Sequence, residues 1–251
     1  MKIGVLGYGN LAKALLQGIT SNGNINKKDI TITAKSEKTL ETAINNGYNA
    51  VNSVSEVFTA DLVILAVKPA VYKTLLPLIP SNFKGGIVST MACYSLQELK
   101  NDFKSASVIR IMPSLLSSNG NDLIAVCGDT DKFTDFTSLL ENAGKVIITS
   151  EEKFNAYLIA VSCGVGFSAY IVESYNKALS NLGFSIEESK DITSVIFSAS
   201  AVEPNREEFY KKVATKGGVT ELGLNEFENG NLNKIVENGV LKAYNKVVNK
   251  G

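Results

Sequence analysis

A glycine-rich motif close to the N-terminus constrains the fold of this chain more than any other feature. The motif runs Gly7-Tyr8-Gly9-Asn10-Leu11-Ala12 and matches the pattern GxGxxA. A short apolar run from Ile3 to Leu6 precedes it, and a helical pattern from Leu11 to Ser21 follows. In this context the first glycine permits a tight turn, the second lets backbone approach a pyrophosphate, and the alanine lets helix pack on strand. The motif therefore predicts a dinucleotide site at the start of a helix.

Short apolar runs alternate with helical patterns as far as Ser150, which predicts βα units on a parallel sheet. The expected strands are 3–6, 30–34, 62–67, 86–90, 108–112, 123–127 and 145–149. The expected helices in this part include 11–21, 37–46 and the polar stretch 131–142. Beyond Ser150 the apolar spacing is helical, over 151–183, 185–201 and 232–249. We therefore predict a Rossmann-type doubly wound domain over 1–150 and an all-helical domain over 151–251.

Composition narrows the classes of function. The formal net charge is zero, which indicates a small-molecule partner rather than a nucleic acid or a membrane surface. The chain has no histidine, which excludes Ser-His-Asp and Cys-His hydrolases and every His-ligated metal. Three cysteines without a CxxC pair indicate neither a disulfide framework nor a zinc site and favour the cytoplasm. We expect Cys93, Cys127 and Cys163 to be core residues rather than nucleophiles.

The second expected strand favours NADPH over NADH. An NAD site normally ends this strand with Asp or Glu, whose carboxylate accepts from the ribose 2′-hydroxyl. Here Ile30–Ala34 leads into Lys35-Ser36-Glu37-Lys38, which places cations and a hydroxyl where a 2′-phosphate would lie. The alternative is that Lys35 and Lys38 are simply solvated and that Glu37 turns toward the ribose. In that case the protein could also use NADH. The candidate cofactor residues so far are Gly7, Gly9, Asn10, Leu11, Ala12, Lys35 and Ser36.

Three further segments carry a family resemblance over essentially the whole length. They are Ala66-Val67-Lys68-Pro69 after a strand, Arg110-Ile111-Met112-Pro113, and Val213-Ala214-Thr215-Lys216-Gly217-Gly218-Val219-Thr220 followed by Gly223. In this order they resemble the pyrroline-5-carboxylate reductase family, whose last segment reads Thr-Ser-Pro-Gly-Gly-Thr-Thr. A Gly-Gly turn at a helix start also suits a carboxylate, because it exposes backbone N–H groups.

The resemblance implies reduction of the C=N bond of 1-pyrroline-5-carboxylate to L-proline with NADPH, the last step of proline biosynthesis. It implies that Ala66, Val67, Lys68 and Pro69 contact the cofactor. On this reading Thr220 hydrogen-bonds the ring nitrogen as the catalytic residue, and Gly217, Gly218 and Val219 bind the substrate carboxylate. The family is dimeric, with intertwined C-terminal domains that build the substrate site at the subunit interface, so we expect a homodimer or larger homo-oligomer.

Departures from the family pattern keep alternatives open. Ser114 and Leu116 follow Pro113 where the family has Asn and later Pro, and Lys216 and Val219 replace Pro and Thr. A reductase of another cyclic imine and a non-catalytic NADP-binding regulatory protein are the alternatives. A β-hydroxyacid dehydrogenase shares this domain order, but the first lysine after the Gly164–Gly166 stretch is Lys177, beyond the usual interval for its catalytic lysine.

Overall fold

The computed structural model describes residues 1–249 and divides them into two compact units. The first unit comprises residues 1–163 together with residues 244–249, and the second comprises Gly164–Ala243. The sequence boundary at Ser150 lies earlier than this division. Helix α7 (Glu151–Tyr157) packs against strand β7 of the first unit, which explains the difference.

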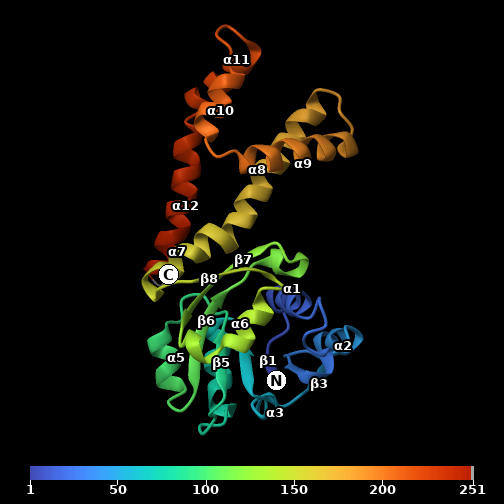
Figure 1. Ribbon diagram of the computed structural model, residues 1–251, viewed down its shortest axis with the longest axis vertical. Helices are drawn as coiled ribbons and strands as arrows, with labels where there is room; N and C mark the ends of the chain where they lie inside the picture. The colour runs from blue at the N-terminus through green and yellow to red at the C-terminus, as the bar shows by residue number, and fades with distance from the viewer. Residues whose placement is uncertain (250–251) are drawn as a thin grey trace. The chain divides into compact units, whose positions relative to one another are not determined.

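An eight-stranded sheet forms the centre of the first unit (Figure 1). Its order is β3-β2-β1-β4-β5-β6-β7-β8, and the first six positions have the doubly wound order of dinucleotide-binding domains. The strands are β1 (Ile3–Leu6), β2 (Ile30–Thr33), β3 (Asn49–Val51), β4 (Leu62–Leu65), β5 (Gly86–Ser89), β6 (Ser107–Met112), β7 (Asp122–Gly128) and β8 (Gly144–Ile148).

Two features of the sheet depart from the prediction. The short edge strand β3 was not predicted, because its three residues, Asn-Ala-Val, carry no periodic pattern. Strand β7 runs antiparallel to β6, whereas β8 runs parallel to β7. The connection from β6 to β7 is a compact turn through the short helix η3 (Leu115–Asn119). This connection is too short for the crossover that parallel neighbours need.

Helices cover both faces of the sheet, as continuous apolar strands require. One hydrophobic core lies under α1 (Asn10–Ile19), α2 (Glu37–Asn45) and α6 (Thr134–Leu140). The other lies under α3 (Val54–Val57), α4 (Pro69–Leu75) and α5 (Leu96–Asp102). Short helical turns η1 (Lys27–Asp29), η2 (Leu76–Leu78) and η4 (Thr130–Lys132) complete the unit. The doubly wound fold is confirmed.

Helix α1 packs unusually closely on η3, because Gly18 has no side chain. A Cβ at Gly18 would lie 2.2 Å from Ser117 O and 2.6 Å from Ala143 Cβ. We expect Gly18→Ala to lower the free energy of unfolding by about 1–3 kcal/mol, the usual cost of overpacking a tight core. Urea unfolding measures it, with Gln17→Ala on the exposed side of α1 as control. Equal stability of the two variants would contradict the tight α1–η3 contact.

The second unit is entirely helical. Its helices are α8 (Gly164–Asn181), α9 (Ile186–Val202), α10 (Arg206–Val213), α11 (Val219–Asn229) and most of α12 (Leu232–Val248). A capping box, in which Ser185 and Glu188 cap each other's backbone N–H groups, starts α9. Large apolar side chains stay on the surface of this protomer, including Tyr170 and Leu182, each 75% exposed. Such a surface indicates that these helices bury apolar area against another chain.

Candidate active site

The glycine loop between β1 and α1 has the geometry of a phosphate cradle. Gly7 has φ +99°, and a Cβ there would lie 2.6 Å from Val67 Cγ1 and 2.7 Å from Ala66 O. A Cβ at Gly9 would have no heavy atom within 4 Å apart from its neighbours in the chain, so the space in front of it is open. Gly9 also begins α1 as its N-cap, and the N–H groups of the first turn point beyond the helix end. The residues present therefore fit a bound pyrophosphate.

The loop after β4 lies directly beside the glycine loop. Ala66 N–H donates to Leu6 O at 2.9 Å, which continues the β1–β4 pairing to the end of both strands. Lys68 is the N-cap of α4 and Pro69 occupies its first turn, where proline's missing N–H costs nothing. The order of the sheet reverses between β1 and β4, and ligands of open α/β sheets bind at such a switch point. The structure thus brings Ala66 and Val67 together with Gly7, and Lys68 and Pro69 follow them at the start of α4.

Tyr8, which lies between the two glycines, holds the loop through contacts with Tyr48 and Asn46. Its ring is buried and packs edge-on against Tyr48, with centroids 5.9 Å apart. The Asn46 amide donates to its hydroxyl at 2.8 Å, and burial raises the pKa of that hydroxyl. The neutral phenol is therefore a structural anchor, which the sequence motif did not reveal.

The end of β2 presents cations at the surface beside this loop. Gly7 N–H donates to Thr33 O at 2.8 Å, which joins the glycine loop to the end of β2. Lys35 and Ser36 come two and three residues after Thr33. Lys35 and Lys38 are exposed. Ser36 is the N-cap of α2, and its Oγ accepts from Thr39 N–H at 3.3 Å. Ser36 therefore has a capping role in addition to the phosphate contact predicted for it.

The Gly-Gly segment of the second unit begins helix α11, as predicted. Gly217 has φ +74°, and Gly218 is the N-cap, followed by Val219 and Thr220 in the first turn. Gly218 N–H donates to Thr215 O at 2.9 Å, and a Cβ at Gly218 would lie 2.5 Å from Thr215 Oγ1. The Gly218 N–H is thus used within the turn. Val219 and Thr220 lie in the first turn of α11, where backbone N–H groups have no partner within the helix.

Glu221, which the sequence reading missed, lies at this helix start. Its Oε2 accepts from Gly217 N–H at 2.7 Å. An acidic residue in the first turn is favourable for the helix dipole. The capping-box pattern, an acidic residue three positions after an N-cap, was the signal that could have identified it.

The cysteines differ in burial. Cys127 is buried in β7, and burial raises the pKa of its thiol to about 12, so it is not a thiolate at neutral pH. Burial also raises the pKa of Cys163. The prediction that all three are core residues holds for Cys127. Cys163 is only half-buried, and the prediction is wrong for Cys93, which is exposed in the loop after β5 and has φ +59°. Within residues 1–249, no three or more His, Cys, Asp or Glu side chains lie together as a group that could hold a metal ion.

The stretch Glu151–Asn181 is long and apolar enough to cross a membrane by length and composition alone. It consists of α7, the π-helical turn η5 (Leu158–Cys163) and α8, and its most apolar window is 11% buried. A helix that dimerises through an apolar face meets the same criterion, so the finding by itself is weak evidence for a membrane span.

An open, doubly wound sheet with a glycine loop at its switch point, followed by a helical unit, defines a dinucleotide-dependent oxidoreductase of two domains. Residues 2–93 match the family model for NADP oxidoreductase, coenzyme F420-dependent. Residues 151–249 match the model for pyrroline-5-carboxylate reductase dimerisation. The cofactor class and the helical dimerisation domain predicted from the sequence are confirmed.

Full-length relatives agree with both matches. A pyrroline-5-carboxylate reductase of Staphylococcus epidermidis is 26% identical, over 98% of this chain and 96% of its own length. The crystal structure of 1-pyrroline-5-carboxylate reductase from Streptococcus pyogenes is 25% identical, with a TM-score of 0.90 and 98% of each chain covered. A Plasmodium falciparum pyrroline carboxylate reductase with NADP bound, 20% identical, shares the fold with a TM-score of 0.87, over 98% of this chain and 97% of its own. Over nearly its whole length the chain is therefore similar to pyrroline-5-carboxylate reductases, and its C-terminal part matches their dimerisation domain.

Proposed function

We propose that this protein reduces the C=N bond of 1-pyrroline-5-carboxylate with NADPH and releases L-proline. The observation that carries the proposal is the order of the two domain matches, together with a full-length similarity to reductases of this name. The open space at Gly9 and the Gly-Gly start of α11 supply the two kinds of site that the reaction needs. The last step of proline biosynthesis is the pathway assignment that follows.

NADPH, when bound, supplies a hydride to the carbon of the C=N bond. The chain's task is to hold the substrate beside the nicotinamide and to stabilise its nitrogen and carboxylate. On this proposal the N–H groups of Val219 and Thr220 hold the carboxylate, while Gly217 and Gly218 allow a close backbone approach. The Thr220 hydroxyl hydrogen-bonds the ring nitrogen. A protonated imine needs no strong acid, so the reaction is compatible with a chain that lacks histidine.

For the cofactor we propose contacts from the first-turn residues Asn10, Leu11 and Ala12 to the pyrophosphate. Ala66, Val67, Lys68 and Pro69 line the approach of the nicotinamide half. Lys35 and Ser36 contact the 2′-phosphate, since a cation and a hydroxyl at the end of β2 suit a dianion. This assignment makes NADPH the preferred cofactor and leaves NADH as a weaker one.

Lys35→Glu is expected to weaken NADPH binding roughly tenfold or more, because a carboxylate would then face the 2′-phosphate. NADH binding should stay within about twofold, because NADH carries no phosphate there. Fluorescence titration of both cofactors measures the effect. Lys28→Glu, at an exposed lysine before β2, is the control. Equal weakening of NADPH and NADH binding would remove Lys35 from the 2′-phosphate site.

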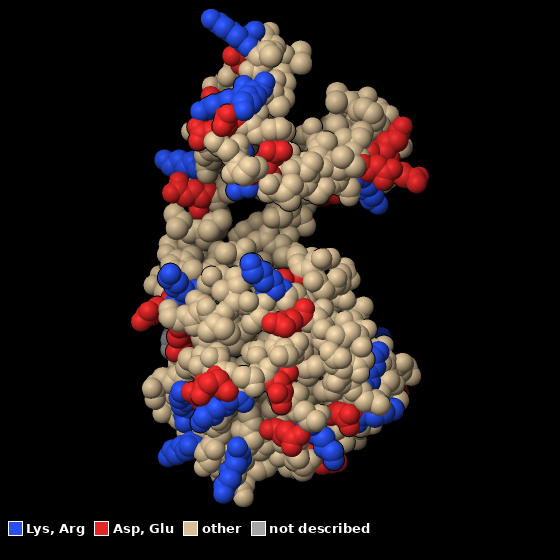
Figure 2. All heavy atoms as spheres, in the orientation of Figure 1, with Lys and Arg blue, Asp and Glu red and all other residues tan. Residues whose placement is uncertain are grey.

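The dimerisation match indicates a homo-oligomer that acts on a small molecule. We further propose a homodimer built from the helices of 151–251, because these carry large exposed apolar side chains. Basic and acidic side chains are interspersed on the face shown in Figure 2, which favours neither a nucleic-acid nor a membrane partner. The cytoplasm is the proposed compartment.

A second candidate, reduction of another cyclic imine, is favoured by one observation. The Glu221 carboxylate already occupies the Gly217 N–H, beside the place proposed for the substrate carboxylate. A fixed negative charge there disfavours an anionic substrate relative to a neutral one. NADPH oxidation by the purified protein with 1-pyrroline-5-carboxylate and with 1-pyrroline, which lacks the carboxylate, distinguishes the two. Faster turnover of the carboxylate with proline as product supports the first proposal, and preference for 1-pyrroline supports the second.

A further inference from the structure

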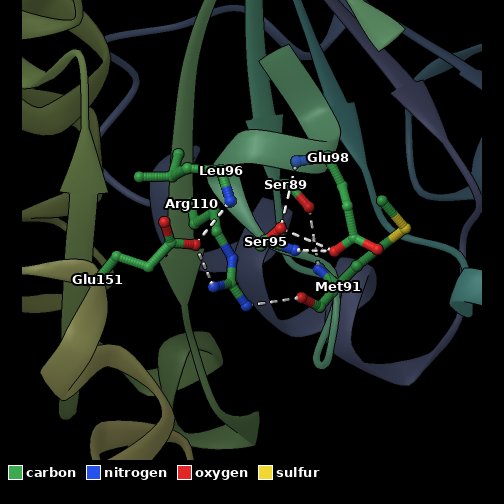
Figure 3. Close-up of polar contacts among 7 residues, drawn as sticks. All are labelled: Ser89, Met91, Ser95, Leu96, Glu98, Arg110 and Glu151. Carbon is green, nitrogen blue, oxygen red and sulfur yellow. Dashed lines mark hydrogen bonds and ion pairs between the residues drawn. The ribbon is translucent and has the colours of Figure 1, made fainter. Parts of the chain in front are cut away.

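A buried arginine in the central sheet is tied to the start of the dimerisation segment. Arg110 lies in β6 with its side chain 3% exposed, and its Nη1 lies 3.0 Å from Glu151 Oε1 (Figure 3). Its guanidinium also stacks over the Phe154 ring, with Cζ 4.3 Å from the centroid. Both partners belong to α7, where the dimerisation match begins.

The same ion pair holds both ends of the loop that follows β5. Arg110 Nη2 donates to Met91 O at 3.3 Å, near the start of this loop. The same Glu151 Oε1 accepts from Leu96 N–H at 2.6 Å, at the start of α5 (Figure 3). Between these two contacts lies Cys93 with φ +59°, a conformation that persists in a non-glycine residue when its surroundings hold it. We call residues Thr90–Ser95 the β5 loop.

The β5 loop lies at the cofactor edge of the sheet. Thr90 N–H donates to Leu65 O at 3.1 Å, so the loop leaves its strand beside the Ala66–Pro69 loop. Both loops follow neighbouring parallel strands at their carboxyl ends, on the far side of the switch point from β2. In this fold the adenosine half of a dinucleotide lies over β1 and β2, which leaves the β4–β5 side to the nicotinamide half.

We propose that Arg110 and Glu151 are positioning residues, which fix the β5 loop for the nicotinamide half of the cofactor through Met91 and Leu96. The pair makes this arrangement depend on the docking of α7. A buried guanidinium that loses its carboxylate is strongly unfavourable, so the loop is expected to rearrange when Glu151 is neutralised. The proposal rests on the dinucleotide site proposed above and is independent of the identity of the imine.

The test compares two ligands on one variant. Glu151→Gln keeps an oxygen that can accept from Leu96 N–H but removes the charge that pairs with Arg110. We expect the Kd of NADPH to rise roughly tenfold and that of 2′-phospho-ADP-ribose, which lacks the nicotinamide, to change less than about twofold. Glu152→Gln, at the exposed neighbouring residue, should leave both unchanged. Arg110→Lys keeps the positive charge, but an ammonium group cannot reach Glu151 and Met91 at once as the planar guanidinium does. We expect this variant to lose NADPH affinity selectively as well.

Calorimetric titration of both ligands, beside a melting curve for each variant, separates the outcomes. Equal weakening of NADPH and the fragment, or no weakening of either, in folded Glu151→Gln and Arg110→Lys proteins would overturn the positioning role. A wild-type protein that binds neither ligand would instead refute the proposed cofactor site itself. A selective loss for NADPH supports the proposal whichever imine proves to be the substrate.

Discussion

Gly9→Val is expected to weaken NADPH binding strongly while leaving the fold unchanged. A Cβ at Gly9 would have no heavy atom within 4 Å apart from its neighbours in the chain, so we expect the unliganded protein to accommodate a side chain there. The same side chain would occupy the space into which the pyrophosphate must move, and it would block the N–H groups at the start of α1. We expect the Kd of NADPH to rise on the order of 100-fold or more, equivalent to about 3 kcal/mol. Fluorescence titration and a melting curve measure the two effects.

Gly7→Val provides the matched contrast. Gly7 has φ +99° and a Cβ there would overlap Val67 and Ala66, so this variant should lose stability as well as binding. A Gly9→Val protein that binds NADPH normally would contradict the glycine-loop assignment. A Gly9→Val protein that melts far below the wild type would contradict the open space seen in front of this residue.

Thr220→Ala is expected to lower kcat on the order of 100-fold while leaving the Kd of NADPH unchanged. The proposed role of the hydroxyl is a hydrogen bond to the substrate nitrogen, and a positioned group of this kind commonly contributes that much. Thr220 lies in the first turn of α11 and is exposed in the protomer, so its truncation should not disturb packing within the unit. Steady-state kinetics with a separate NADPH titration checks both statements.

Thr220→Ser is the control for this prediction, because it keeps the hydroxyl and removes only a methyl group. We expect it to retain most of the turnover. Unchanged kcat in Thr220→Ala would remove Thr220 from the mechanism, and equal losses in both variants would assign its effect to shape rather than to the hydroxyl.

The features that could be predicted from sequence are those that depend on a few consecutive residues. The GxGxxA loop, the strands around it and the Gly-Gly start of α11 each depend on local backbone requirements, and each lies where the sequence places it. The antiparallel strand β7 could not be predicted, because its direction depends on which strand it pairs with. The edge strand β3 was too short to show a period.

The features of the site that could not be predicted depend on contacts between residues far apart in the sequence. The Arg110–Glu151 pair joins residues 41 positions apart, and no local pattern marks either as the other's partner. Gly218 was interpreted as a ligand-binding N–H, yet that N–H closes the turn onto Thr215. Cys93 was assigned to the core from its apolar neighbours, but the chain turns there with a positive φ and leaves the thiol exposed.

The most direct test of the central claim is transfer of deuterium from NADPH labelled at nicotinamide C4, on the face that the enzyme uses, to the product. Purified protein is incubated with both C4-deuterated stereoisomers in separate reactions with 1-pyrroline-5-carboxylate, and the product is analysed by mass spectrometry. We expect L-proline that carries one deuterium on the carbon of the former C=N bond, from one stereoisomer only. Absence of labelled proline from both, with NADPH bound, would contradict a reductase acting on this imine.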